Sequence, residues 1–297
     1  MTDRRTQLDA IAITVLLTCC TLWGLNQVAA KVAMADIPPL MQAGVRSLGA
    51  AVLVLLWARW RGVPMFAADA TLRGGLIAGS LFAAEFACIF LGLQFTTASR
   101  MAVFIYLSPF VVALGMPFIA HSEKLKPVQW LGLTAAFAGV AIAFAEGFHA
   151  PAAGERQWLG DALGIAAAAL WGATTLAIRA SRLATAPPEK TLAYQLAISG
   201  VLLGLAALAT GERWPAVMAP LSAGSMVFQT VIVTFASYLA WFWLVRHYPA
   251  TRIASFTLLT PVAGLAFGVL LLDEPLTLRL LIALVAVATG LVLVNRR

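Results

Sequence analysis

The stretch CCTLWGLNQVAAK, residues 19–31, decides the fold, because its pattern returns in the second half of the chain. Leu22-Trp23-Gly24 recurs as Leu170-Trp171-Gly172, an offset of 148 residues, and the same offset pairs Lys31 with Arg179. Both copies lie inside long apolar runs. Similarity at a fixed spacing indicates internal repetition, so we expect two related halves.

Other short motifs keep nearly the same spacing along the whole chain. Pro38-Pro39 pairs with Pro187-Pro188, Ser108-Pro109 with Thr260-Pro261, and Gly139 with Gly290, at offsets of 149, 152 and 151. The offset of 149 also places Arg46 opposite Gln195. A nearly constant offset favours duplication over chance.

The composition excludes an ordinary soluble domain. The chain has 297 residues, of which 61% are hydrophobic and 11% charged, whereas soluble domains carry about 25% charged residues. Ten apolar runs have about the length that a helix needs to cross a bilayer, and they lie at 10–33, 38–59, 74–95, 100–120, 127–146, 159–181, 189–210, 223–246, 251–272 and 277–295. Because lipid offers no hydrogen bonds to an open backbone, each run is predicted to be a helix. The predicted fold class is an all-α polytopic membrane protein with ten transmembrane helices.

Each half of the chain would contain five helices. An odd number makes the second copy enter the membrane from the opposite side, which gives two inverted five-helix repeats. We expect the first repeat at 1–147, a connecting loop at 148–158 and the second repeat at 159–297. Inverted repeats are typical of transporters, in which substrate binds between the halves near the middle of the bilayer.

The basic residues predict the orientation. Of the 20 Lys and Arg residues, fourteen fall in segments on the side of the N-terminus and two lie within helices; the other four, Arg100, Arg156, Arg213 and Arg279, fall on the opposite side. The positive-inside rule then predicts that both termini are cytoplasmic, in the cytoplasmic (inner) membrane of a bacterium. The first run is too long for a signal peptide and should remain as a helix. Scattered charges also argue against a nucleic-acid partner.

The sequence lacks the motifs of the common membrane-associated enzymes. No phosphate-binding G-x-x-x-x-G-K-[ST] loop and no H-E-x-x-H motif occur, and the cysteines, Cys19, Cys20 and Cys88, lie inside apolar runs without metal-ligand spacing. We therefore expect no enzymatic activity, no cofactor and no metal.

These motifs together resemble the drug/metabolite transporter superfamily, and within it the ten-helix EamA-type exporters. The residues that carry the resemblance are Leu22-Trp23-Gly24 with Lys31, Arg46 after the double proline, Ser108-Pro109, Thr260-Pro261 and Asp273-Glu274-Pro275-Leu276. In Glu85 and in its aromatic content, the chain is most similar to the YddG-type aromatic amino acid exporters. The resemblance implies export of amino acids, metabolites or drugs.

Two helices present matching polar faces. Trp23, Asn26 and Gln27 share one face of the first helix, and Trp171, Thr174 and Thr175 share the corresponding face of the sixth. In a membrane such a face turns to the bundle interior or to a wet cavity. Substrate binding and hydrogen bonding between helices both remain open.

Charged residues within the spans are the other candidates. Glu85 lies near the middle of the third helix, where it would bind substrate or a proton, or form a structural pair with Arg46 or Lys31. Arg46 is expected to hold a substrate carboxylate or to form a structural ion pair, and Gln195 is its counterpart. Lys31 and Arg179 are expected to snorkel to the membrane surfaces.

Aromatic residues gather on the third and eighth helices. Phe82, Phe86 and Phe90 form a stripe at helical spacing. Tyr238 and Trp241 lie in the second copy, where Tyr238 aligns with Phe86. An aromatic-lined cavity would suit a flat apolar substrate, although such stripes also face lipid or neighbouring helices. The candidate substrate-binding residues are therefore Trp23, Asn26, Gln27, Arg46, Glu85, Phe86, Trp171, Thr174, Thr175, Gln195, Tyr238 and Trp241.

The predicted function is a secondary transporter that exports amino acids, aromatic or bulky apolar ones favoured, or related small metabolites by alternating access. An exchanger for anionic metabolites such as sugar phosphates is the alternative, and an intramembrane enzyme is a weaker one. The expected partners are a small-molecule substrate and the lipid bilayer. A homodimer is a further option, because Ala135, Gly139, Ala143, Ala286 and Gly290 form small-residue seams that would pack helices together or join two copies.

Overall fold

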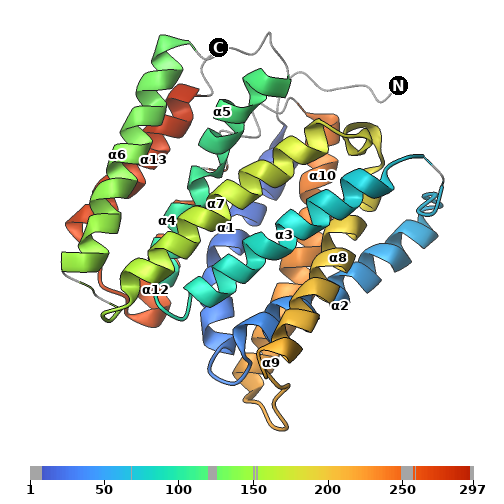
Figure 1. The fold of residues 1–297 in the computed structure, drawn as a ribbon, viewed down its shortest axis with the longest axis horizontal. Coiled ribbons are helices and arrows are strands. Elements are labelled where there is room, and N and C mark those ends of the chain that lie inside the picture. The colour runs from blue at the N-terminus through green and yellow to red at the C-terminus, as the bar shows by residue number, and fades with distance from the viewer. Residues whose placement is uncertain are drawn as a thin grey trace.

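The computed structural model describes residues 9–67, 69–119, 126–149, 151, 153–248, 257 and 259–294. Within these ranges every regular element is helical (Figure 1). The first copy contains α1 (Ala10–Ala33), α2 (Pro39–Trp60), α3 (Leu72–Gly92), α4 (Ala98–Phe104), η1 (Ile105–Leu107), α5 (Ser108–Ile119) and α6 (Pro127–His149). The second contains α7 (Gln157–Arg179), η2 (Arg182–Thr185), α8 (Pro188–Ala209), α9 (Pro220–Val227), η3 (Phe228–Ser237), α10 (Tyr238–His247), α12 (Leu259–Leu272) and α13 (Leu278–Val294).

Eight helical stretches in the described part of the chain are long and apolar enough to cross a membrane, and two shorter apolar helices follow at Leu259–Leu272 and Leu278–Leu293. This all-helical architecture is that of an integral, polytopic membrane protein. The ends of the predicted spans agree with the helices to within a few residues, except that the start of the run 251–272 lies outside the described residues.

Within the described residues, two of the predicted spans are not single α-helices. The run 100–120 is divided into α4, the 3₁₀ turn η1 and α5, and Pro109 directly follows this interruption. Proline removes a backbone donor and crowds the preceding turn, which accounts for the break. The run 223–246 contains η3, a ten-residue π-helix between α9 and α10. Such segments often lie at functional sites.

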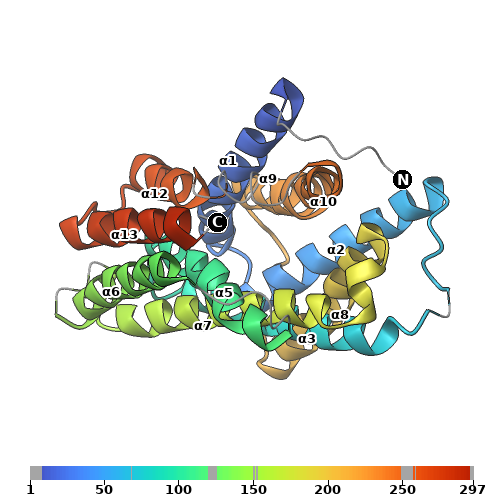
Figure 2. The same ribbon diagram turned by 90° about the horizontal axis from the view of Figure 1, so that it is seen from above.

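The helices pack in pairs drawn from both halves of the chain. Helix α6 lies along α13 at one side of the molecule, and α2 lies along α8 at the other (Figure 2). Between them α3 packs on α7, and α1 packs on α12. The α6–α13 contact contains the small-residue seam: a Cβ on Gly290 would lie 2.9 Å from that of Ala136, and one on Gly139 would meet Ala286. This seam therefore joins two helices of the same chain.

Candidate functional site

Two aromatic side chains contact Trp23 on α1. Its Nε1 donates a hydrogen bond of 2.8 Å to the hydroxyl of Ser237, which in turn donates to the carbonyl of Val233 at 2.6 Å. The Trp23 ring meets Trp241 and Tyr238 edge to face, at centroid distances of 5.2 and 6.2 Å. These contacts hold the Trp23 indole against the end of η3 and α10. They bring together Trp23, Tyr238 and Trp241, three of the predicted substrate-binding residues.

Trp171, the counterpart of Trp23, belongs to a second aromatic pair. Its ring lies 5.8 Å from that of Tyr106, at an interplanar angle of 89°. Tyr106 is buried in η1, and the sequence prediction missed it. Its signal was a lone tyrosine in an apolar run, directly before the Ser108-Pro109 motif.

Arg46 is fully buried on α2 and lies against the aromatic stripe of α3. Its guanidinium carbon is 4.2 Å from the centre of the Phe86 ring and 5.1 Å from that of Phe90. No described residue accepts a hydrogen bond from its three side-chain nitrogens. Contact with the ring faces offsets only part of the cost of burying the charge. The guanidinium donors thus have no partner among the described residues.

Glu85, one residue before Phe86, is also buried. Arg46 interacts electrostatically with Glu85 and Tyr238, yet no hydrogen bond joins the guanidinium to the carboxylate. One carboxylate oxygen, Oε2, has no partner among the described residues. Arg46 and Glu85 are therefore close enough to interact electrostatically but are not joined by a hydrogen bond.

Unpaired oxygens extend this polar region along α1, α2 and η3. The side-chain carbonyls of Asn26 and Gln27 are buried without a partner in the described part of the chain. The same holds for Gln42 and Gln229, whose amide groups donate to the carbonyls of Ala30 and Ala29 at 3.2 and 3.4 Å. Gln42 and Gln229 were missed, because a glutamine within an apolar run has no motif around it. A buried acceptor without a partner costs about 1–3 kcal/mol, and a ligand or water would recover that cost.

The second copy contributes uncharged side chains, and two of them form hydrogen bonds within their own helix. The hydroxyls of Thr174 and Thr175 donate to the carbonyls one turn earlier on α7, at 2.8 and 3.1 Å. Gln195 is buried on α8. At the offset of 152, Glu85 corresponds to Ser237. The charged groups of the candidate site thus come from the first copy.

Lys31 does not supply the counter-ion of Glu85. Its Nζ donates to the carbonyl of Thr96 at 2.7 Å and lies 3.6 Å from Oε1 of Glu274. Glu274 accepts the backbone N–H groups of Ala98 and Ser99 at 2.7 and 2.9 Å. It therefore neutralises the positive N-terminal end of α4.

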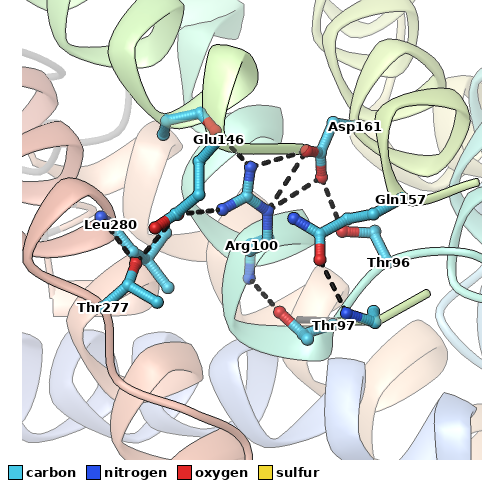
Figure 3. A network of polar contacts seen from close by, with 10 residues as sticks. Thr96, Thr97, Arg100, Glu146, Gln157, Asp161, Thr277 and Leu280 are labelled. Atoms are coloured by element: carbon cyan, nitrogen blue, oxygen red, sulfur yellow. Dashed lines mark hydrogen bonds and ion pairs between the residues drawn. The ribbon is translucent and has the colours of Figure 1, made fainter. Parts of the chain in front are cut away.

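A second buried charge cluster lies around Arg100, near the start of α4 (Figure 3). The Arg100 guanidinium donates to both oxygens of Asp161 on α7, from Nη2 at 2.6 Å and from Nε at 3.0 and 3.2 Å. Its Nη1 donates to Glu146 of α6 at 2.8 Å. Thr96 and Thr277 donate to Asp161 and Glu146 at 2.5 and 2.9 Å. The sequence prediction had treated Arg100 only as a topology signal.

Comparison with known proteins agrees with this architecture. A solved crystal structure superposes with a TM-score of 0.67 over 96% of this chain and 97% of its own, at 17% identity, and so shares the fold. The uncharacterized transporter YvbV of Bacillus subtilis is 28% identical over 93% of this chain and 88% of its own length. A probable amino-acid metabolite efflux pump of Escherichia coli is 27% identical over 91% and 90%. Residues 10–145 and 158–296 both match the EamA-like transporter family, and the chain therefore belongs to that family of membrane transporters.

Proposed function

We propose that this protein is a secondary transporter that exports amino acids, aromatic or bulky apolar ones in particular, by alternating access. It consists of ten transmembrane helices in two inverted repeats, 1–147 and 159–297, joined by 148–158. Both termini face the cytoplasm across a bacterial inner membrane. Family membership supports transport, and the basic-residue asymmetry of the sequence supports the orientation.

The packing pattern supports the inverted repeat. At offsets of 148 to 152, α7 corresponds to α1, α5 to α12, and α3 to the segment formed by η3 and α10. Helix α3 packs on α7, and the corresponding segment η3 packs on α1. Helix α5 packs on α7, and α12 packs on α1. Exchanging the two copies thus maps these contacts onto one another, as a pseudo-two-fold axis requires.

The observation that carries the substrate proposal is the unpaired Arg46 guanidinium beside Glu85 and a set of aromatic rings. An amino acid brings a carboxylate for Arg46, an ammonium for Glu85 and an apolar side chain for the rings of Trp23, Tyr238 and Trp241. Two relatives, from Escherichia coli and Salmonella typhimurium, are described as probable amino-acid metabolite efflux pumps, which agrees with this substrate class.

An exchanger for sugar phosphates would need several free cations at one place. Among the described residues, the buried cations Arg100 and Lys190 are already bonded to carboxylates. Arg46 is the buried cation with unpaired donors. A single carboxylate therefore fits the site better than a phosphate dianion does.

Transport by purified protein in liposomes tests the proposal. The wild type should carry labelled phenylalanine and should prefer it to phenethylamine, which lacks the carboxylate. Arg46→Gln should lower phenylalanine transport roughly ten- to a hundredfold, because it removes a charge-assisted hydrogen bond to the carboxylate. It should also abolish the preference for phenylalanine over phenethylamine. Glu85→Gln should weaken transport of both molecules, because each carries the ammonium.

Arg73→Gln is the matched control, because it removes the same charge at an exposed position of α3. Its transport should equal that of the wild type at equal amounts of monodisperse protein. If the wild type carries neither phenylalanine nor tryptophan, the substrate assignment is wrong. If Arg46→Gln retains the full preference for phenylalanine, Arg46 does not hold the carboxylate.

A further inference from the structure

The Arg100 cluster joins the two halves of the chain at one end of the bundle. Arg100 and Glu146 belong to the first copy, and Asp161 and Thr277 to the second (Figure 3). The three charged residues are 2%, 6% and 0% exposed for Arg100, Glu146 and Asp161, so water does not screen their attraction. Any movement that separates the halves at this end must break these bonds.

The charges of the Arg100 cluster are not repeated at their counterpart positions in the sequence. The offsets that relate the copies carry Arg100 to Arg252, Asp161 to Ile13 and Glu146 to Arg297. The second arginine thus has no carboxylate at either counterpart position.

An ionic contact has a property that an apolar seam lacks. Small residues such as Gly139 and Gly290 pack α6 closely against α13, so the fold has a less costly way to join helices. Burying an ion pair carries a large desolvation cost, and that cost is recovered when the separated charges meet water. Such a contact is stable when closed and tolerates being opened, as a switching interface must.

We propose that Arg100, Asp161 and Glu146 form a latch that keeps this end of the transporter closed and opens once in each transport cycle. With both termini cytoplasmic this is the outer end, so the latch favours a resting state that is closed to the outside. The proposal rests on alternating access, but it does not depend on the identity of the substrate.

A buried residue next to the latch reports its opening. Met101 is fully buried on α4 and contacts the next helices: a Cβ on Gly92 would lie 2.6 Å from its Cε, and one on Gly164 of α7 would lie 3.3 Å from its sulfur. In a chain with Cys19, Cys20 and Cys88 replaced by alanine, Met101→Cys would be labelled by a membrane-impermeant thiol reagent only when α4 and α7 separate.

Labelling in sealed vesicles of either orientation tests the latch. Asp161→Asn should raise the labelling rate from the Arg100 end about tenfold, which corresponds to about 1.4 kcal/mol, without raising the rate from the opposite end. Thr96→Val, which removes one bond to Asp161, should act in the same direction more weakly. If Asp161→Asn does not yield monodisperse protein, Glu146→Gln and Thr96→Val decide the question.

Lys190→Gln is the control, because it breaks the ion pair of the buried Lys190 with the exposed Asp69, near the other end of α3. It should leave labelling from the Arg100 end unchanged. Unchanged labelling in all the latch variants overturns the proposal, and so does equal acceleration from both ends, which would reveal general loosening. Labelling needs no substrate, so a protein that opens as predicted but carries no amino acid retains the latch and rejects the substrate assignment.

Discussion

The carboxylate of Asp69 joins the loop after α2 to the beginning of α8. It accepts hydrogen bonds from Nζ of Lys190 at 2.7 Å and from the Thr71 hydroxyl at 2.6 Å. These bonds, that of Lys190 first, lower the pKa of Asp69 from an ordinary value near 3.8 to about 2. Because the pKa is depressed in the folded protein, the stabilisation is complete above about pH 4 and is lost as the pH falls toward 2.

We therefore expect Asp69→Asn to lower the melting temperature at pH 6, and the gap from the wild type to close between about pH 4 and pH 2. Melting of both proteins in detergent across this range measures it. Glu155→Gln, at an exposed position of the connecting segment, serves as the control and should show no such closing gap. A difference between wild type and Asp69→Asn that is the same at every pH would contradict the assignment.

Single residues were predictable from the sequence where their type was rare for its surroundings. A charge in the middle of an apolar run is costly, so Arg46 and Glu85 were conspicuous. The structure buries both, with Arg46 over the ring of Phe86 and in electrostatic interaction with Glu85. Arg100 lies at the end of a span, where charges are ordinary. Its burial depends on contacts with helices far away in the chain, and no local pattern reveals them.

At the scale of helices, glycines set how closely the two copies of the first helix approach their neighbours. A Cβ on Gly24 of α1 would lie 2.7 Å from that of Ala263 on α12, and one on Gly172 of α7 would lie 2.6 Å from that of Val111 on α5. The repeat offsets carry Gly24 to Gly172 and Val111 to Ala263, so the two contacts are counterparts of each other. The repeated glycine therefore serves the same close crossing twice.

Gly24→Ala and Gly172→Ala should each destabilise the protein by about 1–3 kcal/mol, the usual cost of overpacking. Gly224→Ala, in a helix with open space around it, should be neutral or slightly stabilising, because alanine is the better helix former. Thermal unfolding of the three variants in one detergent gives the comparison. A Gly24→Ala protein as stable as Gly224→Ala would show that the crossing has room to spare.

The π-helix η3 is the element that sequence patterns could not supply. Its counterpart α3 is a regular helix, and residues 228–237 contain neither glycine nor proline. The length of the apolar run predicted the span, but it could not distinguish a π-helical hydrogen-bond pattern from the usual one. At its end, the Ser237 hydroxyl donates to Val233 within the same helix and accepts from Trp23 of α1. The contact with Trp23 is tertiary and is invisible to local propensity.

At the scale of the whole molecule, the asymmetry of fourteen basic residues against four predicts the orientation. Reporter fusions after Arg297 and within the connecting segment at Gly154 should therefore report opposite sides of the membrane. A reporter active only in the cytoplasm should work at Arg297, and one active only outside should work at Gly154. Both fusions reporting the same side would refute the ten-helix topology.

The contact of α6 with α13 joins a helix to its own counterpart, as the contact of α2 with α8 also does. The offset of 151 maps one helix onto the other, and it maps Gly139 onto Gly290, which both take part in the seam. A surface that packs against its own equivalent is what crystallographers call an isologous contact, the hallmark of two-fold homodimers. In quaternary terms, this single chain contains the kind of interface that two identical subunits form, here between two helices of one chain.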